Sequence, residues 1–471
     1  MDWAMTAPIM LDRTESGPLH LQIANRLRAA ITAGVLAPGA RLPSARSLAG
    51  QLGVARGTAD AGYAVLIGEG VLVPRGSAGT IVSPVLAARV ASPAQRRMPF
   101  ARQAAGSPAP PLPFRMGVPA LDVFPRKLWT GLTVREARAV GADALAYPDP
   151  AGHRPLREAI AAYLGVARGI LCAPEQVVVT AGFQGALTLA MRVLLRPGDA
   201  VWVEDPGYQY TRLALEAAGV VLVPVRVDGE GMRVAAATKG APRARLAVVT
   251  PTHQCPLGVA LSLPRRLALL GWAADAGGWV LEDDYDSEFR YTGHPLPALK
   301  SLDRGGRVLY AGTFSKVLFP ALRLGYLVVP DELAEAFGRA ARLGSQGLPA
   351  LEQCVVARFM AEGHFARHLR RMRALYAARR QALATALSAA FGNRATLELA
   401  AGGMHLLARF PGAADDGTLA RRALAAGLGP AALSSLAVAH DCGQGLLLGF
   451  TNVAESEADG LAKRLATALA G

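Results

Sequence analysis

Apolar residues recur at helical spacing near the start of the chain. Every fourth position from Leu19 to Ile31 is apolar, and this pattern ends at Gly34, which predicts a first amphipathic helix. A second short helix is predicted over 44–52, a glycine turn follows at Gly53, and another helix begins within 54–58. The order of helix, glycine turn and helix is typical of a helix-turn-helix.

Two short apolar runs, at 71–73 and 80–83, flank a turn rich in Gly and Pro. They predict a two-stranded wing, so that residues 1–83 would form a winged helix-turn-helix. In such a module the start of one helix enters the major groove while other side chains meet phosphates. We expect base contacts from Arg56 and Thr58, and phosphate contacts from Ser44, Arg46 and Arg75. A protein-interaction or purely structural module is the alternative interpretation.

Periodicity is lost over residues 84–113, which are dominated by Ala, Pro, Gly, Ser and Arg. This composition predicts a semi-extended linker. Its arginines suit either a solvated linker, which we favour, or contacts with a DNA backbone.

Beyond the linker, apolar bursts alternate with helical stretches. The bursts at 177–179, 200–203, 246–249, 280–281 and 308–310 predict a mostly parallel sheet with flanking helices over 114–471. A smaller α/β subdomain is expected from about residue 340, with strands at 402–406 and 446–450. Ligands of such a sheet bind at the carboxyl ends of its strands.

Composition restricts the possible classes of protein. A chain of 471 residues exceeds a single core, and a net charge of +14 suits a polyanionic partner. The excess of basic residues over residues 1–83 is nevertheless small, so the case for DNA binding depends on the helix-turn-helix motif more than on charge.

The four cysteines form no C-x-x-C pair, which predicts reduced thiols rather than disulfides or a zinc site. No secretory signal or long apolar run is present, and we expect a cytoplasmic protein with no membrane segment.

The apolar run at 308–310 leads into a hydroxyl-rich turn that contains Lys316. A lysine amine becomes a nucleophile when burial or cationic neighbours remove its proton near neutral pH, and its usual product is a Schiff base. Thr313, Ser315 and Arg323 are residue types that bind phosphate. Taken alone, one lysine is more often a solvated surface charge.

A second stretch changes that balance. Four acids follow the apolar run at 279–281, among them Asp283, and Tyr285 lies between them. A carboxylate at this place can keep a pyridinium nitrogen protonated, and a tyrosine hydroxyl can bond the phenolic oxygen of the same ring. The alternative is a solvated acidic loop.

Together these two stretches resemble the aminotransferase-like domain of the MocR subfamily of GntR-type transcriptional regulators, a fold type I pyridoxal-phosphate protein. The resemblance covers most of the chain and implies that pyridoxal phosphate is attached to Lys316. It also implies phosphate contacts from Phe183 and Gln184 and ring stacking by Tyr208. Tyr147 would reach the phosphate of a neighbouring subunit, which implies a homodimer that can be domain-swapped.

Two positions depart from the pattern of related transaminases. Cys255 stands where those enzymes have an Asn that touches the ring oxygen, and Leu447 stands where an arginine clamps the substrate carboxylate. Loss of such a clamp removes both affinity and orientation. Transaminase activity toward α-amino acids is therefore weakened as a hypothesis.

We consequently expect a regulator that binds double-stranded operator DNA and senses pyridoxal phosphate itself or an amino compound, controlling vitamin B6, amino-acid or amine metabolism. An active aminotransferase with an accessory N-terminal domain is the main alternative, and a DNA-binding protein with a dead cofactor domain is a weaker one. His364 and His368 lie four apart on a basic helix but have no evident third ligand, so we expect a solvated helix and no metal site.

Overall fold

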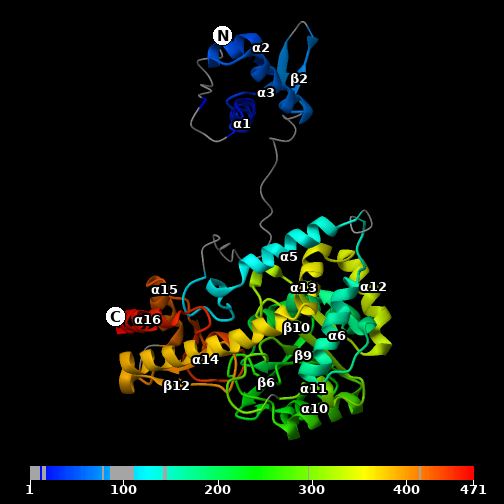
Figure 1. Cartoon of the computed structure of the whole chain (residues 1–471), viewed down its shortest axis with the longest axis vertical. Helices are drawn as coiled ribbons and strands as arrows, with labels where there is room; N and C mark the ends of the chain where they lie inside the picture. Colours follow the sequence, from blue (N-terminus) through cyan, green and yellow to red (C-terminus); the bar gives the residue numbers. More distant parts are fainter. Residues whose placement is uncertain are drawn as a thin grey trace. The chain divides into compact units, whose positions relative to one another are not determined.

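The computed structural model describes residues 11–12, 17–76, 79–84, 111–141, 146–294, 296–412 and 415–470. The chain divides into two compact units, Met1–Ser107 and Pro108–Gly471, and each is described by itself (Figure 1). Most of the predicted linker, 84–113, lies outside the described residues. No helix of the described part is long and apolar enough to cross a membrane.

The N-terminal unit packs three helices against a small sheet. The helices are α1 (Leu19–Thr32), α2 (Ala45–Leu52) and α3 (Arg56–Gly68). Gly53 takes a left-handed conformation with φ of 62° between α2 and α3, as a tight helix-to-helix turn requires. The apolar faces of the helices meet in one core that includes the fully buried Ile23, Leu27, Leu48 and Leu66.

The wing has one more strand than the sequence predicted. β2 (Leu72–Pro74) and β3 (Thr80–Val82) form the expected antiparallel pair, and β1 (Arg41–Leu42) adds to the other edge of β3. A strand of two residues has too few positions to show an alternating pattern, so only its pairing in the folded unit reveals it.

The C-terminal unit is built on an eight-stranded sheet in the order β4-β11-β10-β9-β8-β5-β6-β7. The neighbouring pairs from β10 to β6 are parallel, whereas β11 runs antiparallel to both β10 and β4. All five predicted strands are present. The strands are β4 (Val177–Thr180), β5 (Ala200–Asp205), β6 (Val221–Asp228), β7 (Gly231–Met232), β8 (Leu246–Val249), β9 (Trp279–Asp284), β10 (Val308–Thr313) and β11 (Gly325–Val328).

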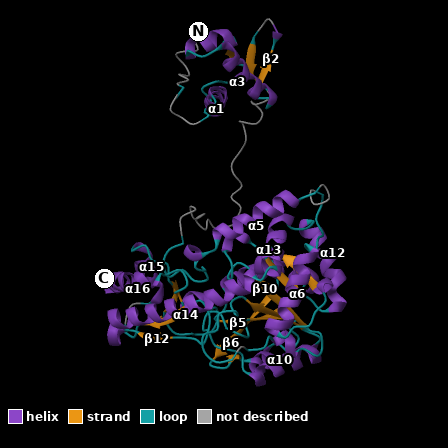
Figure 2. Cartoon of the chain, in the orientation of Figure 1, coloured by secondary structure: helices purple, strands orange, loops and turns teal. Residues whose placement is uncertain are grey.

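Helices cover both faces of this sheet (Figure 2). Successive residues of one strand enter different hydrophobic clusters, as Leu309 and Tyr310 of β10 do, so both faces are buried. Burial on both faces explains why the strands read as continuous apolar runs. The helices are α5 (Arg126–Ala139), α6 (Arg154–Arg168), α7 (Gly182–Leu194), α8 (Gln209–Ala217), α9 (Val234–Gly240), α10 (Leu263–Ala276), α11 (Leu299–Leu302), α12 (Ala334–Ser345) and α13 (Ala350–Ala361).

The smaller subdomain contains an antiparallel sheet in the order β12-β13-β15-β14, and α14 runs toward it from the large sheet (Figure 1). Phe337 and Ala341 of α12 pack in a core of the large sheet, so the subdomain starts later than the predicted residue 340. Its elements are α14 (His364–Phe391), β12 (Thr396–Glu398), β13 (His405–Arg409), α15 (Asp416–Ala425), β14 (Ala431–Ala432), β15 (Leu446–Gly449) and α16 (Ala458–Ala470).

The basic helix α14 is less solvated than the sequence suggested. His368 is buried, and its Nε2 lies 2.8 Å from the carbonyl oxygen of Val317. That contact holds α14 to the segment that follows Lys316. Among the described residues no group of three potential metal ligands comes together.

Candidate functional site

A cavity of about 380 Å³ opens at the carboxyl ends of β9 and β10. All but one of the residues predicted to bind a cofactor line it, although they come from five separate stretches of sequence. These lining residues are Phe183, Gln184, Tyr208, Asp283, Tyr285, Thr313, Ser315, Lys316 and Arg323. Tyr147 is the exception, because its side chain is 86% exposed and does not line the cavity of its own chain.

Lys316 lies in the turn after β10, and its Nζ donates a hydrogen bond of 2.9 Å to the carbonyl oxygen of Gly117. Burial lowers the pKa of this amine and outweighs the opposing effect of Cys255, Asp286 and Asp283. Gly117 has a φ of 68°, and a Cβ built on it would lie 2.4 Å from Nζ. The positive φ favours glycine here, a preference that sequence reasoning missed because no motif surrounds this residue.

A phosphate cradle lies at the start of α7. Arg323, itself left-handed with a φ of 51°, places Nη2 3.3 Å from the Ala181 carbonyl oxygen, next to the first turn of α7. The Gln184 Nε2 and Ser315 Oγ atoms are buried and find no hydrogen-bond partner among the described residues. Free N–H groups at a helix start, one guanidinium and two unpartnered polar atoms together fit a phosphate.

Asp283 supplies the acid on the cavity side of β9. Burial raises its pKa, and the neighbouring Asp284 and Asp286 add to that effect. A cation placed against the carboxylate would reverse the shift, because an opposite charge favours the ionised form. This is the arrangement that a protonated pyridine nitrogen requires.

Tyr285 is oriented by a buried histidine that sequence reasoning did not single out. Its hydroxyl lies 3.0 Å from His253 Nδ1, which is also 3.1 Å from the Asp286 carboxylate. Burial and the Asp286 charge raise the pKa of Tyr285 well above its usual value. The phenol is therefore protonated at neutral pH and can donate to an oxygen in the cavity.

Cys255 and Leu447, the two residues that differ from the transaminase pattern, lie in different parts of the structure. Cys255 lines the cavity, and burial raises the pKa of its thiol. Leu447 lies in β15, fully buried and paired with Leu407 and Ala431 in the small sheet. It is packed against Leu433 and does not line the cavity, so no arginine clamp is present at that position.

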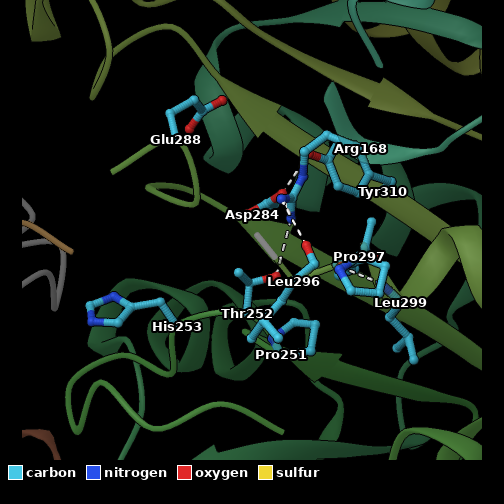
Figure 3. A network of polar contacts seen from close by, with 12 residues as sticks. Arg168, Pro251, Thr252, His253, Asp284, Glu288, Leu296, Pro297, Leu299 and Tyr310 are labelled. Atoms are coloured by element: carbon cyan, nitrogen blue, oxygen red, sulfur yellow. Dashed lines mark hydrogen bonds and ion pairs between the residues drawn. The ribbon is translucent and has the colours of Figure 1, made fainter. Parts of the chain in front are cut away.

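Behind the cavity, a buried ion pair supports β9 (Figure 3). Arg168, the last residue of α6, contacts Asp284 at 2.6 Å and also donates to Thr252 and to the Leu296 carbonyl oxygen. Burial disfavours the guanidinium cation, but Asp284 and other acids around it raise the pKa of Arg168 overall. Tyr310 donates to the same Asp284 oxygen at 2.6 Å.

Two further acids of the large sheet, Glu204 and Glu282, are buried and form no ion pair with a described residue. Glu204 accepts from the Thr250 N–H at 3.1 Å and from Gln254 Nε2 at 3.3 Å, and burial raises its pKa to about 7. Glu282 accepts the N–H groups of Leu299 and Lys300, and burial raises its pKa to about 7 as well. The alternative of a solvated acidic loop at 282–286 is therefore wrong.

The predicted DNA-binding residues lie at helix ends and on the wing of the N-terminal unit. Ser44 caps α2, since its Oγ accepts the Ser47 N–H at 3.1 Å. The Arg56 side chain is 72% exposed and lies 3.4 Å from Asp60 on the same helix. Arg46 and Arg75 are exposed and Thr58 is half-buried.

Comparison with known proteins matches each of the two units to a known family. Residues 19–82 match the family of bacterial regulatory proteins of the gntR type, and residues 130–427 match aminotransferase class I and II. The probable rhizopine catabolism regulatory protein MocR of Rhizobium meliloti is 39% identical over 94% of this chain and 92% of its own length. The chain belongs to the MocR subfamily of GntR-type transcriptional regulators.

Other relatives of this MocR-type regulator include further regulators and aminotransferases. The pyridoxine biosynthesis regulator PdxR of Corynebacterium glutamicum is 34% identical over 79% of this chain and 80% of its own. Among solved structures, the α-aminoadipate aminotransferase LysN of Thermus thermophilus, complexed with a phosphopyridoxyl-leucine, is 30% identical with a TM-score of 0.70. That match covers 76% of this chain and 92% of LysN. The fold type I prediction is thereby confirmed.

Family membership also confirms pyridoxal phosphate as the cofactor of this MocR-type regulator. The cavity fits the group on its own evidence, because it combines a half-buried lysine, a buried carboxylate, a guanidinium and two unpartnered polar atoms. When bound, the cofactor supplies a carbonyl carbon that combines reversibly with amines and a ring that withdraws electrons.

Proposed function

We propose that this regulator senses pyridoxal phosphate itself or an amino compound at Lys316, and that the binding event changes its affinity for operator DNA. The observation that carries the proposal is the half-buried Lys316, whose amine is held by the Gly117 carbonyl inside a cavity that also contains Asp283 and Arg323. The names of relatives, which refer to rhizopine catabolism and pyridoxine biosynthesis, support control of amine or vitamin B6 metabolism.

Each residue has a separate task in this proposal. Arg323, Ser315, Thr313, Gln184 and Phe183 hold the phosphate, and Tyr208 stacks on the ring. Asp283 keeps the ring nitrogen protonated, and Tyr285 donates to the ring oxygen. The lowered pKa of Lys316 favours its neutral amine, which can attack the carbonyl carbon of the cofactor and can be displaced from it by another amine.

The assembly proposed is a homodimer, domain-swapped through the linker 84–113 that joins the DNA-binding domain 1–83 to the effector domain 114–471. Exposure of Tyr147 supports a dimer, because a side chain that its own chain leaves 86% exposed is available to the partner's phosphate site. Closure of the effector domains around a ligand would change the spacing of two DNA-binding heads, and differential affinity for the two states gives regulation.

The operator contacts follow from the exposed N-terminal side chains. Arg56 and Thr58 lie in the first turn of α3 and read base edges, while Ser44, Arg46 and Arg75 bind phosphates. A protein with these contacts acts in the cytoplasm and is associated with the nucleoid when bound to DNA.

An absorption spectrum of the purified protein tests the proposal first. We expect a visible cofactor band that borohydride removes, and an operator affinity that shifts on titration with pyridoxal phosphate or one amine. Lys316→Ala should lose the fixed cofactor and the ligand-dependent shift, while basal DNA binding stays measurable. An unchanged ligand response in Lys316→Ala would contradict the proposal.

An active aminotransferase is the second candidate. The cavity holds the lysine, acid and arginine of such enzymes together, and the fold is that of LysN. Burial of Leu447 at the clamp position argues against turnover of α-amino acids. Steady multiple turnover with an amino donor and a keto-acid acceptor would favour this candidate, whereas a single conversion of the bound cofactor would not.

A further inference from the structure

A strained segment from the start of the C-terminal unit forms part of the cavity. Phe114 is fully buried and has a φ of 69°, which is rare for a bulky residue, and Gly117 three residues later also has a positive φ. The two residues between them, Arg115 and Met116, line the cavity. Backbone strain of this kind persists only where the surroundings hold it, and it is concentrated at ligand-binding sites.

The segment is held by the strand in which transaminases place their substrate-binding arginine. The N–H of Gly449 in β15 donates to the Phe114 carbonyl oxygen at 2.8 Å. A Cβ built on Gly449 would lie 2.4 Å from the Arg115 carbonyl oxygen, so only glycine permits this approach. Leu447, two residues earlier in β15, points into the apolar cluster. The strand thus contributes no arginine of its own and instead fixes the backbone that carries Arg115.

The charge on Arg115 has no partner in the described chain. No acid among the described residues forms an ion pair with it, in contrast to Arg168, which binds Asp284. The other cationic side chains of the cavity already have proposed roles, since Lys316 holds the cofactor and Arg323 binds its phosphate. Apolar side chains also line the cavity, among them Met116, Met404, Ala431 and Leu436. An unpaired guanidinium beside an apolar wall favours binding of an anion.

We propose that Arg115 binds an anionic group of the effector. The effector is then an amine that also carries a carboxylate or a similar anion, with the amine directed to Lys316 and the anion to Arg115. The inference rests on the proposed function, because it assumes that the effector enters this cavity. It assigns to Arg115 the selectivity that an arginine at position 447 would otherwise provide.

Matched probes can test this assignment by equilibrium binding. The full-length protein with its cofactor is titrated with 4-aminobutanoate and 1-aminopropane, and with L-alanine and ethylamine, which differ within each pair by the carboxylate. We expect the anionic member of at least one pair to bind roughly 10- to 100-fold more tightly, the usual gain from a charge-assisted hydrogen bond. Arg115→Gln should reduce that preference to about twofold or less, and Arg115→Lys should keep part of it.

Arg126→Gln is the matched control, since Arg126 is exposed on α5 and outside the cavity. It should keep the full preference. The inference would be overturned if the wild-type protein did not prefer the anionic member of either pair, or if Arg115→Gln kept that preference. It would also be overturned if Arg115→Gln lost affinity equally for the amine and the amino acid. Operator affinity is measured in parallel. Anion preference without any change in operator affinity would refute the proposed function and leave the role of Arg115 standing.

Discussion

The two units of this regulator place their candidate functional groups in opposite environments. In the N-terminal unit the candidate arginines are exposed at a helix end or on the wing, and the Arg56 side chain is 72% exposed. In the C-terminal unit the acids of the site lie within a buried polar network, and Asp283 is only 7% exposed. Exposed groups depend mainly on the backbone beneath them, whereas buried charges depend on partners supplied by distant elements. Substitutions should therefore have larger effects on stability in the second unit than in the first.

The largest effect is expected for the ion pair behind β9. Arg168→Met would leave the Asp284 carboxylate buried without its guanidinium, which should lower the free energy of unfolding by about 3–5 kcal/mol. Urea unfolding followed by tryptophan fluorescence measures this, because every tryptophan except Trp3 belongs to the C-terminal unit.

Two controls sharpen that test. The double variant Arg168→Met/Asp284→Leu removes both charges and should recover most of the loss. In the N-terminal unit, Arg56→Met breaks an exposed pair with Asp60 and should cost less than about 1 kcal/mol, measured by hydrogen exchange of α3 amides. A similar cost for the two arginines would contradict the proposed difference between the units.

An intermediate effect is expected from Glu204, whose pKa burial raises to about 7 from 4.5. Between these values the folded protein binds a proton that the unfolded chain has released, so the free energy of unfolding falls as pH rises through this window. The contribution of one such group is about 3 kcal/mol. Unfolding measured from pH 5 to 8 should show this decline.

Glu204→Gln keeps an acceptor for Thr250 but cannot ionise, so it should weaken the decline with pH. The decline should not vanish, because burial raises the pKa of Glu282 and Glu288 to about 7 as well. A pH profile identical to that of the wild type would show that Glu204 does not titrate in this range.

The smallest effect is expected in α3. Gly57 has a helical conformation and open space around a built Cβ, so Gly57→Ala should stabilise this helix by about 0.5–1 kcal/mol. Hydrogen exchange of α3 amides in the full chain measures the change. Gly53→Ala is the matched control of opposite sign, because its φ of 62° strains any side chain. Reduced protection of α3 in Gly57→Ala would contradict the prediction.

Local patterns in the sequence predicted much of the architecture. Helical periodicity and Gly53 predicted α1 to α3, and apolar runs predicted five strands of the large sheet. β1, β7 and β14 are two residues long, too short to show any pattern. β11 was missed for another reason, since it is an antiparallel strand inserted between β4 and β10 and only the sheet order reveals its role.

For the site, the sequence by itself indicated the cofactor, because the stretches around Lys316 and Asp283 resemble those of MocR-type regulators. The tertiary structure alone decided what surrounds them. Gly117 holds the lysine amine, Arg168 neutralises Asp284, and the strained segment that begins at Phe114 brings Arg115 to the cavity wall. The contacts between Gly117 and Lys316 and between Arg168 and Asp284 join residues more than 100 positions apart, and the place of Arg115 depends on the equally distant contact between Phe114 and Gly449. No local pattern encodes a partner at that separation.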